Sequence, residues 1–115
     1  MRMWMIDPTL LCRKHLLGEH YEIHKAVGFL RNGRSLEPWV INGYLDPRLL
    51  QSRHDAIAQE LAAREYIHSS PLDVPAINLA FTKHIRVISK AKAKKDLVSR
   101  CEGCRKLIEE ATSGI

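Results

Sequence analysis

The sequence predicts an all-α fold, a single compact domain of three main helices with irregular connecting loops. Apolar residues recur at intervals of three and four over long segments, which is typical of helices with one buried face. No segment keeps the strict alternation of apolar and polar residues that indicates a strand. A chain of 115 residues, 45% of them hydrophobic, suits one domain with its own core, so we treat 1–115 as a single unit.

The first helix is predicted over 8–27. Asp7 can cap the free N–H groups of a helix start, and Pro8 suits the first helical position. Gly28 is the predicted end of the helix. The apolar positions Leu10, Leu16, Ile23 and Val27 follow helical spacing. A polar turn at 31–35 and an irregular stretch around Pro38 and Trp39 come next.

The second helix is predicted from Asp46-Pro47 to Tyr66, with a loop over 68–75 after it. Its inner face would consist of Leu49, Leu50, Ile57 and Leu61. Segments 6–15 and 45–54 look alike, and either two similar helix starts or an internal repeat explains this.

The third helical region is predicted from Asn78 to Ala111, with an interruption near 90–95. Lysines and arginines crowd the segment 83–96, which is either a phosphate-tracking surface or a solvated helix face. The whole chain has a net charge of +5 and a pI of about 9.3, which favours a polyanionic partner.

Several function classes are excluded by composition. No apolar run approaches the roughly 20 residues that span a bilayer. Charged residues and Pro8 break the N-terminal apolar stretch, so it does not resemble a signal peptide. Three cysteines, an odd number, fit a reducing compartment. We therefore expect no membrane contact, and a monomer that is cytoplasmic and nucleoid-associated or a viral protein acting in the host cell.

The predicted first helix brings three ionisable residues to one side. At about 100° per residue, His15, Glu19 and Glu22 fall within roughly 60° of one another. Glu22 would lie at the edge of the apolar stripe, where a carboxylate is partly desolvated. It is therefore either a candidate catalytic acid or base, or a solvated acidic side chain of an amphipathic helix.

Two residue pairs have spacings that suit metal ligands. His20 and His24 are four apart on a helix, but no third ligand is evident near them in the sequence. Cys101-x-x-Cys104 is half of a zinc site that Cys12 or His84 could complete. Two thiols packed as small apolar groups would give the same pattern. We expect neither a metal nor an organic cofactor.

The stretch "RKHLLGEHYEIHKAVG" (13–28) resembles the first long helix of the phage-type pyrimidine-dimer DNA glycosylases. The positions that match the family's helix motif are His15, Leu16, Glu19, Glu22, Lys25 and Gly28. The resemblance implies that Glu22 is the catalytic glutamate. The family's nucleophile is the α-amine of its first residue, followed by an arginine, and counting back from Glu22 without a gap places these on Met1 and Arg2.

The resemblance implies a DNA repair glycosylase with abasic-site lyase activity on double-stranded damaged DNA, with pyrimidine dimers as the expected lesion. Free α-amines have a pKa of about 7.7–8.0 against about 10.4 for lysine, so an α-amine forms a Schiff base more readily at neutral pH. The DNA-contacting residues that it implies are Arg2, Lys14, His15, Lys25 and Lys92. Tyr21 departs from the pattern, since an arginine is expected there.

Two other functions fit the same sequence. A basic DNA-binding module without catalysis explains the charge and the short helices, but not the spacing between Met1 and Glu22. A zinc-stabilised interaction domain would be built on Cys101 and Cys104.

Overall fold

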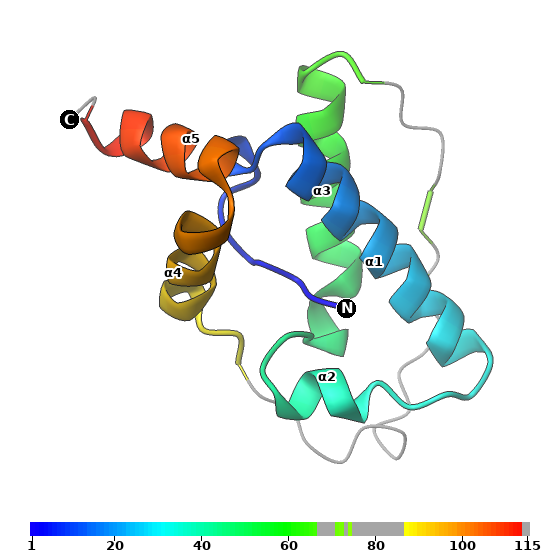
Figure 1. The fold of residues 1–115 in the computed structure, drawn as a ribbon. Coiled ribbons are helices and arrows are strands. Elements are labelled where there is room, and N and C mark those ends of the chain that lie inside the picture. Colours follow the sequence, from blue (N-terminus) through cyan, green and yellow to red (C-terminus); the bar gives the residue numbers. More distant parts are fainter. Residues whose placement is uncertain (67–70, 73, 75–86, 114–115) are drawn as a thin grey trace.

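The computed structural model describes residues 1–66, 71–72, 74 and 87–113, and within these ranges it is helical without strands. In chain order the elements are the 3₁₀ turn η1 (Pro8–Leu10), α1 (Arg13–Arg31), α2 (Glu37–Ile41), the 3₁₀ turn η2 (Pro47–Leu49), α3 (Leu50–Ala63), α4 (Lys90–Arg100) and α5 (Glu102–Ser113) (Figure 1). The all-α prediction is confirmed. The third predicted helix is represented by two shorter ones, α4 and α5.

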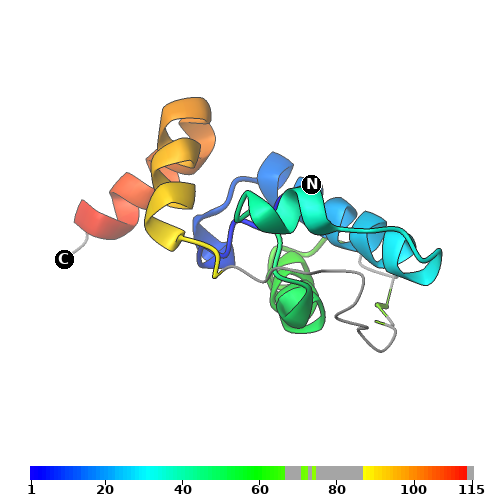
Figure 2. The ribbon, with the colours of Figure 1, turned by 90° about the horizontal axis from the view of Figure 1, so that it is seen from below.

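Helices α1–α3 lie on one side of the molecule and α4 and α5 on the other (Figures 1 and 2). The N-terminal segment, residues 1–6, runs between the two groups and contributes to the core. The fully buried aliphatic side chains include Leu11, Leu16, Ile23, Leu36, Leu45, Leu50, Ile57, Leu61 and Leu97. Burial of this apolar surface is the main stabilising contribution to the fold.

The bounds predicted for the first helix are wrong at both ends. Asp7 caps the short turn η1, where its side chain accepts a hydrogen bond from the Thr9 N–H at 3.0 Å, and the chain is extended again at Cys12 before α1 begins. The helix then continues through Gly28, because the backbone reverses only at Gly33, whose φ is +68°. Glycine adopts this left-handed conformation without the steric penalty of a Cβ.

The second predicted helix is present as η2 followed by α3. Asp46 repeats the cap of Asp7, since its side chain accepts from the Arg48 N–H at 3.1 Å. A shared capping turn therefore accounts for the similarity between segments 6–15 and 45–54. The one-turn helix α2 was not predicted and lies in the stretch expected to be irregular, with Pro38 in its first turn.

The third helical region is interrupted beside the predicted segment 90–95 and again further on, since residues 87–89 directly before it are not helical. Segment 90–95 is continuous helix in α4, because lysine and alanine are good helix formers and Ser89 caps the start by accepting from the Lys92 N–H. The later interruption falls at Cys101, which has an extended backbone. The predicted start at residue 78 lies outside the described residues. Cys101 and Cys104 thus sit at a junction between two helices.

Among the described residues, no helix combines the length and the apolar character that crossing a bilayer requires.

Candidate active site

The N-terminal segment is fastened to α1 through its backbone. The Arg2 N–H donates a hydrogen bond to Oε2 of Glu22 at 2.8 Å, and the Met3 N–H donates to the Tyr44 carbonyl at 2.7 Å. Three covalent bonds separate the nitrogens of Met1 and Arg2, so these atoms are at most about 4 Å apart. The nitrogen of Met1 therefore lies within about 7 Å of the Glu22 carboxylate. The structure thus brings together Met1 and Glu22, two residues 21 positions apart in the sequence.

A buried ion pair between Glu19 and Arg53 also holds the N-terminal segment in place. Glu19 is only 1% exposed and Arg53 of α3 only 5%, and the Nε and Nη2 atoms of Arg53 donate to the two carboxylate oxygens at 2.5 and 3.1 Å. The Trp4 N–H also donates to Glu19, at 3.1 Å. Burial raises the pKa of Glu19, and the hydrogen bonds from Arg53 and Trp4 oppose that effect. One carboxylate therefore connects α1, α3 and the N-terminal segment.

The sequence reasoning placed Glu19 on one side of the helix with Glu22 but did not predict its burial. A signal was available, because Glu19 is three residues after Leu16 and four before Ile23, and both of these are buried. A carboxylate in the middle of an apolar stripe needs a buried cation as partner. Arg53 was not considered as that partner.

Arg2 links the N-terminal segment to α4. Its guanidinium lies 4.1 Å from the ring centre of Trp4 and 4.7 Å from that of Tyr44, and its Nη2 donates to Asp96 at 2.9 Å. The hydrogen bond from Arg2 lowers the pKa of Asp96. The Nε of Arg2 is buried and has no hydrogen-bond partner among the described residues. The fold itself thus uses Arg2, and its predicted contact with a phosphate stays a prediction.

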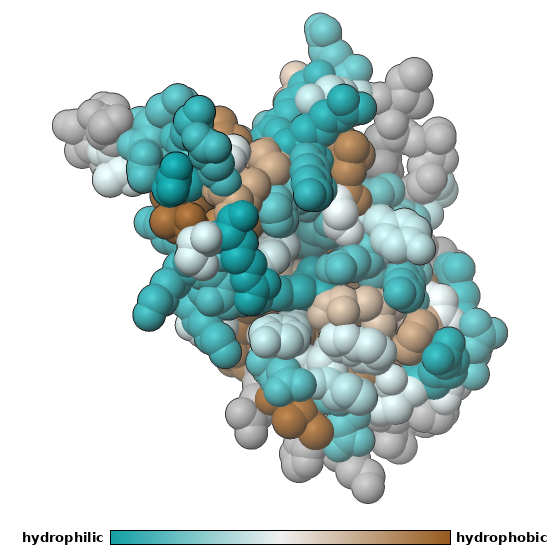
Figure 3. Space-filling view, viewed as in Figure 1, coloured by the Kyte–Doolittle hydropathy of each residue, from teal (hydrophilic) through white to brown (hydrophobic). Residues whose placement is uncertain are grey.

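A pocket of about 330 Å³ opens beside Glu22. Its lining consists of Arg2, Trp4, Lys14, His15, Gly18, Glu19, Glu22 and Arg100. Four of the predicted site residues therefore share one pocket, namely Arg2, Lys14, His15 and Glu22. Figure 3 shows a mixed surface around the N-terminus, with tan and pale residues at its position and teal, hydrophilic ones above it and to its left. A half-buried carboxylate among several cations suits a ligand that carries phosphates and a reactive sugar.

The two remaining predicted DNA contacts, Lys25 and Lys92, are exposed and do not line this pocket. Lys92 is exposed on α4 and lines a smaller pocket of about 150 Å³ together with Arg2 and Tyr44. Lys25 is exposed on α1. Arg100 was not predicted, although it continues the basic character of segment 83–96 to the end of α4.

His15 forms part of the pocket wall from a half-buried position. Burial lowers the pKa of His15, and the positive charge of Lys14 adds to the effect. The ring packs edge-on to Trp4, with centroids 5.7 Å apart, and its Nδ1 lies 3.3 Å from Sγ of Cys12. One side chain therefore belongs both to the pocket and to a cysteine cluster.

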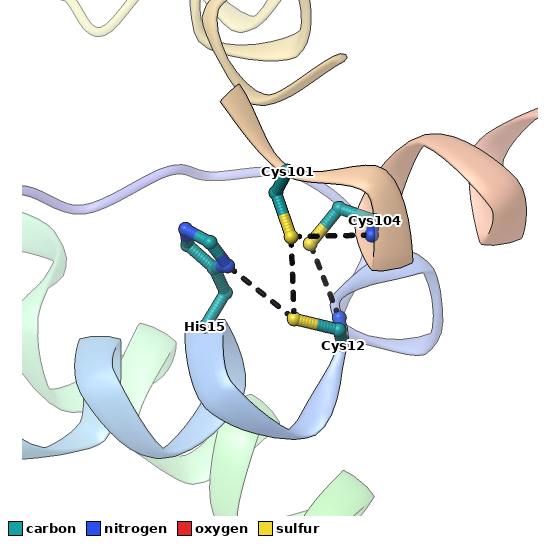
Figure 4. Close-up of side chains that lie close together, drawn as sticks. All are labelled: Cys12, His15, Cys101 and Cys104. Atoms are coloured by element: carbon teal, nitrogen blue, oxygen red, sulfur yellow. Dashed lines mark hydrogen bonds between the residues drawn. The ribbon is translucent and has the colours of Figure 1, made fainter. Parts of the chain in front are cut away.

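Two groups of metal-ligating side chains come together in the fold. Cys12 and His15 at the start of α1 meet Cys101 and Cys104 at the junction of α4 and α5 (Figure 4). Of the two residues considered for completing the Cys-x-x-Cys pair, Cys12 lies beside it, whereas His84 is outside the described residues. Sequence reasoning did not include His15 in this group, although Cys12-x-x-His15 has the spacing of a second ligand pair.

The second group consists of His20, His24 and His54. Their ring centroids are 4.6 to 5.1 Å apart, and His54 comes from α3. It is the third residue that the sequence did not reveal for the His20–His24 pair. In each group the atoms that could bind a metal all lie within 4.8 Å of one another.

The family model described as pyrimidine dimer DNA glycosylase matches residues 1–74. The matched part contains the N-terminal segment, α1, α2, α3 and all of the pocket lining except Arg100. No curated protein and no solved structure matches the chain significantly. Because the match covers more than half of the chain, the protein belongs to the pyrimidine dimer DNA glycosylase family.

Proposed function

We propose that this DNA repair glycosylase cleaves the glycosidic bond of one pyrimidine of a dimer, whose base stays joined to the other pyrimidine, and then cleaves the strand at the abasic site, with the α-amine of Met1 as nucleophile. The observation that carries the proposal is the hydrogen bond from the Arg2 N–H to Glu22. It holds the first residue beside a half-buried carboxylate at a pocket with cationic walls. Membership of the pyrimidine dimer DNA glycosylase family indicates that the substrate is DNA.

Cleavage of the glycosidic bond between the base and C1′, called base release below, requires a nucleophile and a stabilising anion at the sugar. The lone pair of the Met1 nitrogen attacks C1′, and the glycosidic bond breaks with its electron pair leaving on the base, which then takes up a proton. The Glu22 carboxylate stabilises the positive charge that develops on the sugar during this step. The nitrogen then gives up a proton, and its lone pair forms the C=N bond while the C1′–O4′ bond breaks with its electron pair on O4′, which takes up a proton. The product is a protonated imine between enzyme and sugar.

Strand cleavage follows from the imine. The imine acidifies the protons on C2′, and a base takes one of them; Glu22 or a water beside it serves this role. The electron pair forms a C2′–C3′ double bond while the C3′–O bond breaks and the phosphate leaves with its electron pair. Hydrolysis of the imine then releases the free amine.

The pocket must receive a sugar from inside a duplex. The enzyme therefore bends the DNA and extrudes a nucleotide, at a cost of a few kcal/mol that is lowest at a lesion. Lys14 and Arg100 at the pocket, with Lys25 and Lys92 further out, are placed to contact phosphates. His15 and Arg2 contribute from the pocket wall.

Borohydride trapping tests the nucleophile. We expect a covalent adduct with duplexes that contain a thymine dimer or an abasic site, and none with undamaged duplex. Peptide mapping should place the adduct on Met1, and intact mass should show Met1 as the first residue. The matched control is Lys14→Arg, because Lys14 is a primary amine in the pocket lining and arginine keeps the charge but forms no imine.

Each outcome of this experiment points to one mechanism. An adduct that persists in Lys14→Arg and maps to Met1 supports the proposal. An adduct that maps to Lys14 and disappears in the variant rejects Met1 as the nucleophile. A protein that shifts damaged and intact duplexes equally and cuts neither is the non-catalytic module.

Glu22→Gln tests the carboxylate. The amide oxygen still accepts from the Arg2 N–H, so binding to damaged DNA should stay close to that of the original protein while base release falls about 10²- to 10³-fold. Glu109→Gln, an exposed change on α5, is the matched control. Unchanged base release in Glu22→Gln removes this residue from the mechanism.

A further inference from the structure

Four metal-ligating side chains from distant parts of the chain converge at one point (Figure 4). Each half of the group has two ligands separated by two residues, Cys12-x-x-His15 at the start of α1 and Cys101-x-x-Cys104 at the start of α5. The three sulfurs and one imidazole nitrogen lie within 4.8 Å of one another. Three cysteines and one histidine are a common ligand set of structural zinc sites.

The distances match a tetrahedral zinc ion. With Zn–S bonds of about 2.3 Å, two sulfurs of a tetrahedral site lie about 3.8 Å apart, and a sulfur and a histidine nitrogen lie about 3.5 Å apart. Sγ of Cys12 is 3.7 Å from Sγ of Cys101 and 3.3 Å from Nδ1 of His15. These two distances match those expected around zinc, and the remaining ligand atoms lie within 4.8 Å of one another.

We propose that Cys12, His15, Cys101 and Cys104 bind one zinc ion in a closed structural site that is separate from the base-release chemistry. From the sequence we expected no metal and assigned His15 as a DNA contact, not as a metal ligand. In the folded chain its Nδ1 faces Cys12. With Nδ1 on the metal, the proton of the neutral ring is on Nε2, and this fixes one tautomer of a pocket residue.

Two backbone N–H groups point at the sulfurs of the Cys-x-x-Cys pair. The Cys12 N–H donates to Sγ of Cys104 at 3.2 Å, and the Cys104 N–H donates to Sγ of Cys101 at 3.5 Å. Such donors orient metal-bound ligands and stabilise their negative charge. A Cβ at Gly103 would lie 3.2 Å from Cβ of Cys12, so the glycine lets the start of α5 approach α1 this closely.

The site would connect two parts of the molecule. Cys12 and His15 belong to the segment that matches the family model, whereas Cys101 and Cys104 lie beyond its last matched residue, 74. Zinc would thus join the pair α4–α5 to the start of α1. Lys14 and Arg100, both in the pocket lining, are chain neighbours of ligands, so the metal would also set the wall of the pocket.

Metal content tests the proposal on the full chain. We expect one zinc per chain by elemental analysis after purification without chelator, and almost none in Cys104→Ser. The matched control is His24→Asn, which alters the histidine group and should keep the zinc. A metal-free original protein, zinc retained by Cys104→Ser, or zinc lost from His24→Asn would each overturn the assignment.

Cobalt substitution keeps the test decisive if Cys104→Ser fails to fold. Co²⁺ in the original protein should show the strong visible bands of a tetrahedral ion and the near-ultraviolet charge transfer of thiolate ligands. His15→Cys should still bind the metal and should gain charge-transfer intensity from a fourth thiolate. Octahedral spectra, or an unchanged spectrum in His15→Cys, contradict the proposed ligands.

Thiol chemistry distinguishes a zinc site from a disulfide and from free thiols packed as apolar groups. All three cysteines should react with an alkylating reagent after denaturation in chelator, and the folded zinc-bound protein should be protected. A disulfide between Cys12 and Cys101, seen as a mass lower by two hydrogen atoms, refutes the site. Thiols that are fully protected in a folded protein shown by elemental analysis to hold no zinc are packed as apolar groups, and this outcome also refutes the site.

Discussion

Replacing Glu19 by glutamine is expected to lower the free energy of unfolding by about 3–5 kcal/mol, because the change leaves the Arg53 guanidinium buried without a counter-charge. Arg53 is 5% exposed, so water does not replace the lost carboxylate. The glutamine oxygen can still accept from the Trp4 N–H, but its NH2 group then faces the Arg53 Nε–H, so the loss reports on the missing charge and on this hydrogen bond together. This is a large part of the roughly 5–15 kcal/mol that stabilises a typical domain.

Arg53→Met should behave differently, because its partner Glu19 can bind a proton and become neutral. Burial raises the pKa of Glu19 even with Arg53 present, and removing the guanidinium removes the main opposing effect. The folded variant therefore binds a proton at a higher pH than the unfolded chain does. Its stability should increase as the pH is lowered from 7 towards 5, since protonation removes the buried charge.

Urea unfolding followed by circular dichroism measures both effects, with the free energy extrapolated linearly to water. Glu102→Gln is the matched control, because Glu102 pairs with Lys106 at 3.5 Å on the exposed side of α5 and such pairs contribute at most about 1 kcal/mol. A loss below about 1 kcal/mol in Glu19→Gln would show that Arg53 finds another partner or water, and the reasoning about the buried pair would be wrong.

Three further predictions concern other parts of the fold. Gly28→Ala should stabilise α1 by about 0.5–1 kcal/mol, since a Cβ there meets nothing within 4 Å. Gly33→Ala should destabilise the protein by about 1 kcal/mol, because the φ of Gly33 is +68°. Thermal unfolding of the two variants measures both effects. Asp96→Asn should lower the free energy of unfolding at pH 7, because Arg2 holds the pKa of Asp96 below its ordinary value. The difference in free energy between the variant and the original protein should vanish as the pH falls below about 4 and Asp96 becomes protonated. Unfolding measured over a series of acidic pH values checks the sign. Gly18→Leu should preserve stability and reduce turnover, since it places a side chain in the pocket without a clash at Cβ; equal turnover would show that the pocket does not receive the substrate.

The helical periodicity was sufficient to predict the class of fold and most of the buried apolar positions. Leu16, Ile23 and Val27 are buried as their spacing predicts, and so are Ile57 and Leu61. The ends of the elements were harder to predict, because capping signals also start 3₁₀ turns. Asp7 and Asp46 both cap such a turn.

The candidate site was predictable where it depends on one helix and not where it depends on contacts between segments. His15, Glu19 and Glu22 share one side of α1, as their positions in the sequence predict. Arg53, Asp96 and Arg100 reach the site from other helices, and spacing along the chain carries no information about such approaches. The partnership of His15 with Cys101 and Cys104 has the same origin.

The way residues 2–4 are fastened has a practical consequence for expression. The backbone N–H groups of these residues donate hydrogen bonds to Glu22, Tyr44 and Glu19. Moving the N-terminal segment to accommodate a fused sequence would break these hydrogen bonds. A purification tag attached ahead of Met1 would emerge next to the pocket and would also block the α-amine that the proposed mechanism uses. Recombinant protein for assays should therefore carry its tag after residue 115, or lose an N-terminal one without leaving a scar.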